Sequence, residues 1–142
     1  MINCDSYNNV SDGVRIDVGG ANIYNAYLCN CLLVSNGGWG VNNVDTTSRL
    51  TVVETCGFFG NTSGQTTGPA DMIVNNSVTL AASPYADPAN GDFSIIAGDA
   101  RNDGRGAFVM GGSYTKSTTG YPDLGAAQHL DAGLFVPRRF VR

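Results

Sequence analysis

Asn3-Cys4-Asp5-Ser6-Tyr7-Asn8-Asn9 is the first of three copies of one short pattern in this sequence. In every copy an asparagine follows a cysteine after five residues, and a glycine comes three or four residues later. The equivalent residues are Cys4, Cys31 and Cys56, then Asn9, Asn36 and Asn61, then Gly13, Gly40 and Gly64. The copies follow one another at intervals of roughly 25 residues, and a period of about 20 to 50 residues indicates a solenoid or another repeat array.

The segments between these positions resemble short β-strands. Residues 27–35 and 50–59 are rich in β-forming side chains, and residues 14–18 make a second short run. No window of ten residues has the 3.6-residue period of a helix, because glycine and asparagine interrupt every candidate. Two or three short strands per repeat, bent at asparagine and glycine, predict an all-β fold built as a parallel β-helix. A β-sandwich with turn residues at chance spacing is the alternative.

Stacking of the copies assigns a structural role to the repeated asparagines and glycines. Asn9, Asn36 and Asn61 are expected to adopt the left-handed conformation at a bend. They are also expected to hydrogen-bond side chain to side chain as a ladder. The glycine of each copy is expected to supply the second unusual backbone angle of the corner.

The four cysteines predict buried free thiols rather than disulfides. Cys4, Cys31 and Cys56 share one repeat position, so stacked copies place them in an inward row. Strand alternation puts Cys29 on the same face as Cys31. The same alternation directs Glu54 inward, which predicts a bulge, an exposed edge or a partner there, because burial of an unpaired charge is costly. A zinc site is less favoured, since no histidine lies near the Cys-x-Cys pair.

Composition narrows the class of protein. The 142 residues are enough for one domain with a buried core. Charged residues make up 14% of the chain and the net charge is −4, which argues against nucleic acid or an anionic membrane as the main partner. No apolar run approaches the roughly 20 residues that span a bilayer. The first residues have no signal-peptide pattern and open inside a repeat, which predicts either the C-terminal part of a longer protein or a bare end near residues 2–8 that docks on a neighbour.

After residue 82 the repeat gives way to two other motifs. The first is Asp87-Pro88-Ala89-Asn90-Gly91-Asp92-Phe93, and the second is Pro122-Asp123-Leu124-Gly125-Ala126-Ala127-Gln128. Together with the repeats they resemble, over residues 2–128, the C-terminal part of right-handed parallel β-helix repeat proteins of the pectate-lyase-like superfamily. The resemblance implies β-helix coils over residues 1–82 and a closing segment over residues 83–128 that covers the C-terminal end. Residues 129–142 form a tail outside that pattern.

The superfamily includes enzymes that cut acidic polysaccharides with grouped carboxylates, or with calcium and a basic residue. Asp5, Asp12 and Asp17 lie in the first repeat with Arg15 among them, and paired carboxylates suit glycoside hydrolysis. None of these acids recurs at a matching position in the next repeat, and an aspartate in an Asp-Gly turn more often braces its own backbone. A polysaccharide lyase or glycoside hydrolase, or the remnant of one, is therefore the alternative function.

Metal and histidine chemistry have little support in the sequence. Asp99, Asn102 and Asp103 are similar to an oxygen-ligand calcium loop, but the required spacing and final glutamate are missing. His129 is the only histidine and lies beyond the last motif. No cofactor is therefore expected, and calcium is the one candidate.

These observations predict a non-enzymatic structural or adhesive module of an extracellular surface, filament or virion. It is expected to assemble through its first coil as a homo-oligomer or to continue a longer β-helix chain. Aromatic side chains that offer a stacking surface for a glycan are Trp39, Tyr27 and Tyr24; for Trp39, a ring folded over the coil edge is the alternative. Candidate interface residues in the tail are Arg138, Arg139 and Phe140, with a frayed terminus as the alternative.

Overall fold

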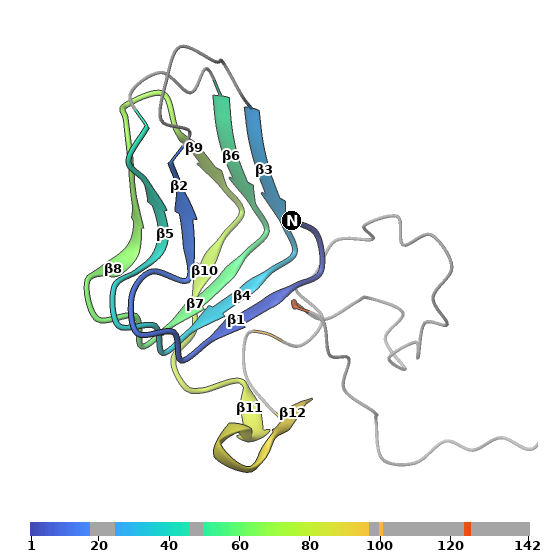
Figure 1. Ribbon diagram of the computed structural model, residues 1–142. Coiled ribbons are helices and arrows are strands. Elements are labelled where there is room, and N and C mark those ends of the chain that lie inside the picture. Colours follow the sequence, from blue (N-terminus) through green and yellow to red (C-terminus); the bar gives the residue numbers. More distant parts are fainter. Residues whose placement is uncertain (18–24, 46–49, 97–99, 101–123, 126–142) are drawn as a thin grey trace, which may run out of the picture.

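The computed structural model describes residues 1–17, 25–45, 50–96, 100 and 124–125. Within these ranges the chain forms three parallel β-sheets and one antiparallel hairpin (Figure 1). Sheet I contains β1 (Asp5–Tyr7), β4 (Leu32–Val34), β7 (Gly57–Phe59) and β10 (Val78–Thr79). Sheet II contains β2 (Val14–Ile16), β5 (Trp39–Asn43) and β8 (Gly64–Thr67), and sheet III contains β3 (Asn25–Cys29), β6 (Leu50–Glu54) and β9 (Ile73–Asn75). The hairpin consists of β11 (Tyr85–Asp87) and β12 (Asp92–Ile95), joined by the 3-10 turn η1 (Pro88–Asn90).

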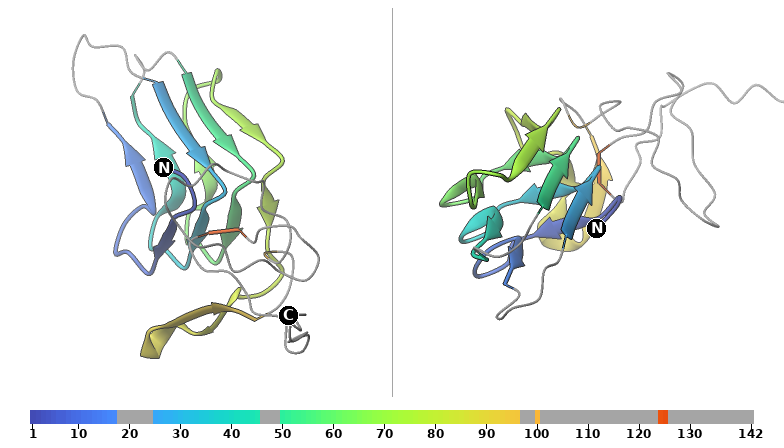
Figure 2. Two further views of the ribbon diagram at one scale, coloured as in Figure 1. Left: turned by 90° about the vertical axis from the view of Figure 1, so that its right-hand side faces the viewer. Right: turned by 90° about the horizontal axis from the view of Figure 1, so that it is seen from above.

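The chain visits the three sheets in a fixed order. It passes from sheet I to sheet II to sheet III and then returns to sheet I, where β4 pairs with β1 and β7 pairs with β4. Each passage is termed a layer: β1 to β3 make layer 1, β4 to β6 layer 2 and β7 to β9 layer 3, and β10 begins a further layer. Figure 2 shows these layers following one another in sequence order, from blue through green. An all-β chain with parallel strands, as predicted from the sequence, is confirmed.

Equivalent residues of consecutive layers lie opposite one another. In sheet I, Leu33 lies between Ser6 and Phe58. In sheet II, Val41 pairs with Val14 on one side and with Thr66 on the other. The same register aligns the residues that precede the strands of sheet I, which are Cys4, Cys31, Cys56 and Ser77. The repeat in the sequence is therefore a repeat in space.

Two corners of each layer turn on residues with positive φ. The corner that enters sheet I uses Asn3 (50°), Asn30 (55°), Thr55 (51°) and Asn76 (48°), and the corner that leaves it uses Asn8 (54°), Ser35 (56°) and Gly60 (64°). Asparagine and glycine suit these positions because they tolerate the left-handed conformation. The expectation that Asn9, Asn36 and Asn61 themselves adopt this conformation is wrong, because in each copy the residue immediately before does so.

Gly13 and Gly40 are needed for space rather than for an unusual backbone angle, so that part of the expectation is also wrong. Neither residue has a positive φ. A Cβ atom on Gly13 would lie 2.7 Å from Nδ2 of Asn36, and one on Gly40 would lie 2.6 Å from the carbonyl oxygen of Gln65. Glycine therefore allows neighbouring layers to approach closely at this corner. In the third copy Gly64 does have a positive φ of 129°, as expected, and it pairs with Trp39 rather than with Gly40.

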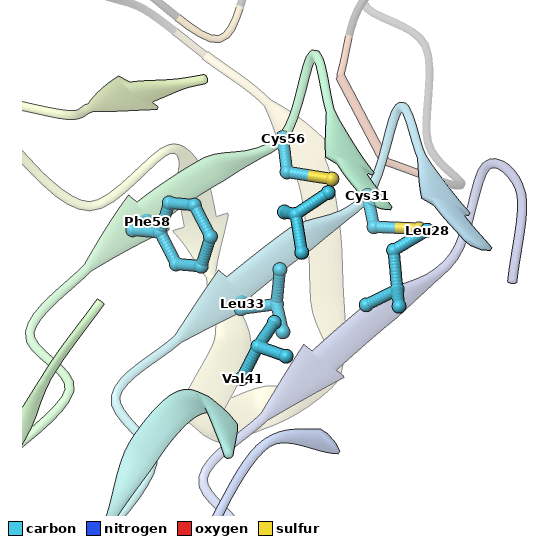
Figure 3. Close-up of a cluster of buried hydrophobic side chains, with 7 residues drawn as sticks. Leu28, Cys31, Leu33, Val41, Cys56 and Phe58 are labelled. Carbon is cyan, nitrogen blue, oxygen red and sulfur yellow. The ribbon is translucent and has the colours of Figure 1, made fainter. Parts of the chain in front are cut away.

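The main hydrophobic core lies between the three sheets. Its buried members are Leu28, Cys31, Leu33, Val41, Val53, Cys56 and Phe58. Figure 3 shows side chains of this cluster pointing toward one another from strands of all three sheets. Fully burying one side chain of this size contributes about 1.5 to 3 kcal/mol, so this cluster is a principal source of stability.

Strand alternation does not continue through the corner before sheet I. Leu28 belongs to the core, whereas Cys29 is buried but lies outside that cluster. The left-handed residue Asn30 then resets the alternation, so that Cys31 points into the core again. The predictions that Cys29 shares the inward face of Cys31 and that Glu54 is directed inward are therefore wrong. Glu54 pairs with Cys29 across an unbroken β3–β6 register.

A second cluster of buried side chains covers the outer face of sheet I. Its members from the sheet are Leu32 and Val34, with Tyr7, Phe59 and Val78 packed against them. The covering residues are Leu80, Tyr85, Phe93, Ile95, Ala100 and Leu124. Tyr7, Tyr85 and Phe93 meet edge to face, with ring centroids 5.2 to 5.8 Å apart. The described parts of the expected closing segment thus lie along the side of the layers, and contact layer 1 through Tyr7 (Figure 1).

Candidate functional site

The best-defined polar feature among the described residues is a ladder of three asparagines at the corner between sheets I and II. Nδ2 of Asn9 donates to Oδ1 of Asn36 at 2.8 Å, and Nδ2 of Asn36 donates to Oδ1 of Asn61 at 2.9 Å. The backbone N–H groups of Asn9 and Asn36 donate to the same two oxygens at 3.1 Å. Asn36 is fully buried, and these bonds satisfy a polar group that would otherwise destabilise the fold.

A second repeated contact lies at the corner that enters sheet I. The thiols of Cys4, Cys31 and Cys56 each donate to the carbonyl oxygen two residues earlier, at 3.2 to 3.4 Å. The hydroxyl of Ser77 makes the same bond to Asn75 at 3.2 Å. A hydrogen bond with Cys31, together with burial, raises the pKa of the Cys56 thiol well above its usual range. The same hydrogen bond lowers the pKa of the Cys31 thiol to about 7. Both side chains are completely buried, so reagents and substrates have no access to either thiol in the folded state.

Ser77 is a member of this series that the sequence analysis missed. The signal was the pair Asn76-Ser77, which repeats Asn3-Cys4 and Asn30-Cys31 with a hydroxyl in place of a thiol. The shorter interval after Cys56 and the change of residue type concealed it.

The candidate carboxylates of the first repeat separate into two places. Arg15 contacts Asp17 at 3.2 Å and Asp12 at 3.8 Å, beside β2. The Asp12 side chain is only 6% exposed, and it accepts hydrogen bonds from the backbone N–H of Trp39 at 2.8 Å and from Nδ2 of Asn42 at 2.9 Å. Asp12 therefore stabilises layer 2. The expectation that its side chain braces its own backbone is wrong.

Asp5 is not part of that group. It lies on β1 in sheet I, and its carboxylate adjoins Gly125 and Tyr85 on the outer face. Burial, and then the charge of Asp5, raise the pKa of the Tyr85 hydroxyl above its usual range. The structure thus brings Asp12, Arg15 and Asp17 together and leaves Asp5 on another sheet.

Two of the three aromatic candidates fall within the described residues. Tyr27 is 46% exposed on the outer face of sheet III, where its hydroxyl donates to Oε2 of Glu54 at 3.1 Å. Hydrogen bonds with Cys29 and then with Glu54 raise the pKa of Tyr27. The half-buried ring of Trp39 lies directly over Gly64 of the next layer, which matches the alternative of a ring folded over the edge. Tyr24 lies outside the described residues.

The inward-facing side chains differ between the two ends of the stack. At layer 1 most of them are apolar: Cys4, Val14 and Ile16 are partly buried and pack on the core, and Ser6, which pairs with Leu33, is the polar exception. Met1 and Ile2, which lie along the edge of β3, are 47% and 46% exposed. At the other end hydroxyl residues take the equivalent places, with Thr66, Ser77 and Thr79 following Val41, Cys56 and Phe58. Val74, which is 43% exposed, is the apolar exception there.

The remaining candidates are outside the part of the chain that the structure describes. These are Asp99, Asn102, Asp103, His129, Arg138, Arg139 and Phe140. Among the residues that are described, no group of three or more histidine, cysteine, aspartate or glutamate side chains is arranged to hold a metal ion. The described residues also include no helix capable of crossing a membrane.

Comparison with known proteins adds no relative. No family model, no curated protein and no solved structure matches this chain.

Proposed function

We propose that this chain is a right-handed parallel β-helix that serves as a non-enzymatic structural or adhesive module. The ordered return of the chain to the same three sheets supports the helix, and crossovers between parallel strands of one sheet are right-handed in about 98% of cases. The resemblance in sequence to pectate-lyase-like β-helix proteins supports the same assignment. An extracellular surface, filament or virion is the setting that this resemblance favours.

The single observation that carries the proposal is the contrast between the two ends of the stack. An exposed face of a repeat array stays soluble when it is polar, whereas an exposed apolar face marks a contact surface. The hydroxyl residues Thr66, Ser77 and Thr79 supply a polar face at one end, whereas at layer 1 the apolar residues Met1, Val14 and Ile16 accompany a single hydroxyl residue, Ser6. Among the described strands, β1 pairs only with β4 and β2 only with β5, so each offers its other edge for pairing with an added strand. We therefore propose that the face of layer 1 packs against a second copy of the chain.

Sedimentation velocity over a range of concentrations tests this assembly. The full chain is expected to form dimers or larger species, and Ile2→Lys is expected to weaken association at least tenfold. The matched control is Ile96→Lys, since Ile96 is 51% exposed, comparable to 46% for Ile2. A wild-type chain that stays monomeric at every concentration, or equal effects of the two variants, would contradict the proposal.

Glycan binding is a second proposed property, carried by Tyr27. Its exposed ring pairs in register with Val52, which in turn pairs with Ile73, so the outer face of sheet III offers an aromatic and aliphatic surface beside the Glu54 carboxylate. Titration of neutral and acidic oligosaccharides, followed by NMR, is expected to shift the side-chain resonances of Val52 and Ile73, which lie in register with Tyr27. Tyr27→Ala should abolish the response and Asn25→Ala, on the same strand, should not.

The alternative of a polysaccharide lyase or glycoside hydrolase has less support in the geometry. The Asp12 carboxylate accepts hydrogen bonds from Trp39 and Asn42 of layer 2, and Asp5 lies away from it on β1 of sheet I. Incubation with acidic polysaccharides, monitored for unsaturated products and reducing ends, is expected to give no product. Product formation that is lost in Asp12→Asn would favour the enzyme instead.

A further inference from the structure

A pocket of about 200 Å³ opens at the corner of layer 3, on the side away from layer 2. Its lining comes from the end of β7, the corner that follows and the start of β8, with one side chain from β10. The lining residues are Phe58, Phe59, Gly60, Asn61, Gly64, Gln65 and Thr79. If the stack continued, the corner of the next layer would lie at this position.

The same surroundings occur one layer earlier, and there they are filled. The register aligns Leu33 with Phe58, Val34 with Phe59 and Trp39 with Gly64. When this register is extended by two residues beyond Val34 and Phe59, Asn36 corresponds to Asn61. The group seated on Asn36 is the side chain of Asn61, whose Oδ1 accepts from the backbone N–H and from Nδ2 of Asn36 at 3.1 and 2.9 Å. The fold itself thus shows which chemical group fits this corner.

Asn61 repeats the side-chain bonds of Asn36 to the preceding layer but not the bonds to a following layer. Its Nδ2 donates to the carbonyl oxygen of Leu33 at 2.8 Å, as Nδ2 of Asn36 donates to that of Ser6 at 3.2 Å. No described residue accepts from the backbone N–H of Asn61 or from the second N–H of its side chain. The equivalent donors of Asn9 and Asn36 both bind a side-chain carbonyl oxygen. The same kind of acceptor would therefore suit the two donors of Asn61.

The strand beside the pocket has a free edge. Among the described strands, β8 pairs only with β5. An added strand on such an edge gains main-chain hydrogen bonds, and a neighbouring pocket selects its side chains. β10 already occupies the next place in sheet I, next to β7. A second copy of the chain would need that place for its own β1, so a single strand fits this site better than another copy.

We propose that the pocket and the β8 edge form a peptide-binding site that accepts an extended segment of a partner protein in parallel with β8. The segment carries an asparagine whose side-chain carbonyl oxygen receives the two donors of Asn61 and becomes the fourth member of the ladder. The site is at the opposite end of the stack from the proposed assembly face. This inference therefore goes beyond the proposed function, and either can fail alone.

The test uses the full isotopically labelled chain and the synthetic peptide Asn-Gly-Gly-Trp-Gly-Val-Asn-Asn, a copy of residues 36–43. Titration followed by NMR is expected to shift the backbone amide resonances of Asn61 and Thr66. A peptide whose first residue is leucine is expected to bind at least tenfold more weakly, because leucine offers no acceptor. Thr79→Trp fills the pocket and should abolish binding, whereas Thr62→Trp, at an exposed position outside the lining, should leave it unchanged.

Three results would overturn the proposal. One is equal binding of the asparagine and leucine peptides, and another is peptide binding that survives in Thr79→Trp. The third is the absence of any shift at Asn61 with peptide in the millimolar range. Self-association measured by sedimentation is a separate readout, so its loss or retention bears on the layer 1 face and not on this pocket.

Discussion

Nδ2 of Asn36 donates a hydrogen bond of 2.9 Å to Oδ1 of Asn61, although 25 residues separate the two in sequence. The Asn36 side chain is completely buried and has polar partners in both neighbouring layers. A contact of this kind reports directly on how the layers stack, because a shift of register by one residue would break it.

The first prediction concerns this asparagine. Asn36→Ala should lower the free energy of unfolding by about 3 kcal/mol, because it leaves polar groups of Asn9 and Asn61 without their partner. Asn25→Ala is the matched control, since Asn25 is exposed on β3, and its effect should stay within about 0.5 kcal/mol. Urea denaturation measures both values. Equal stability of the two variants would show that the ladder contributes nothing.

The second prediction concerns thiol reactivity. Cys4 is only partly buried, whereas Cys29, Cys31 and Cys56 are buried. Burial and a raised thiol pKa both suppress the reactive thiolate, as at Cys56. A thiol reagent at pH 8 should therefore modify one cysteine quickly and the others only on unfolding, and Cys4→Ala should remove the fast phase. A fast phase that persists in Cys4→Ala would contradict the row of inward thiols.

The third prediction is a loss of stability at alkaline pH that depends on Tyr85. Its folded-state pKa is raised, so the folded protein holds a proton that the unfolded chain releases above pH of about 10. The stabilising contribution is complete below that pH and declines as the pH rises further. Denaturation curves between pH 8 and 11 should show this decline, and Tyr85→Phe should reduce its slope. An unchanged slope in Tyr85→Phe would exclude this tyrosine as the cause.

The fourth prediction separates two aspartates that the sequence placed in one cluster. Asp12→Ala should cost about 2 kcal/mol, because the bonds to Trp39 and Asn42 are nearly buried. Asp17→Ala should cost less than about 0.5 kcal/mol, since the Asp17 side chain is 53% exposed and its pair with Arg15 lies at the surface. Thermal denaturation of the two variants measures the difference. Equal destabilisation would mean that Asp12 has no special structural role.

Much of this architecture could be predicted from the cysteine and asparagine repeat. Stacked layers place the same residue type at the same position. The spacing of Cys31 and Cys56 therefore predicts the register in which β4 pairs with β7. The local conformations could not be predicted so well. A single left-handed residue, Asn30 or Thr55, reverses the facing of its neighbours, and alternation along the sequence gives no sign of this.

The candidate site was harder to predict than the fold. Asp5 and Asp12 are close in sequence, but Asp5 lies on β1 and Asp12 lies in the corner before β2, so only the three-dimensional path separates them. The covered outer face of sheet I was also missed. Leu32 and Val34 alternate with Leu33, so β4 has apolar residues on both faces, which in hindsight indicates burial on both sides.

The most direct test of the layered arrangement is a set of proton–proton distances from NMR in the full chain. Contacts between side chains are predicted from Ser6 to Leu33 and from Leu33 to Phe58, because each pair lies in register on adjacent strands about 5 Å apart. None is predicted from Ser6 to Phe58, which lie two strands apart. A spectrum without the contact between Leu33 and Phe58, or with Leu33 next to a residue of another register, would contradict the stacking on which this account depends.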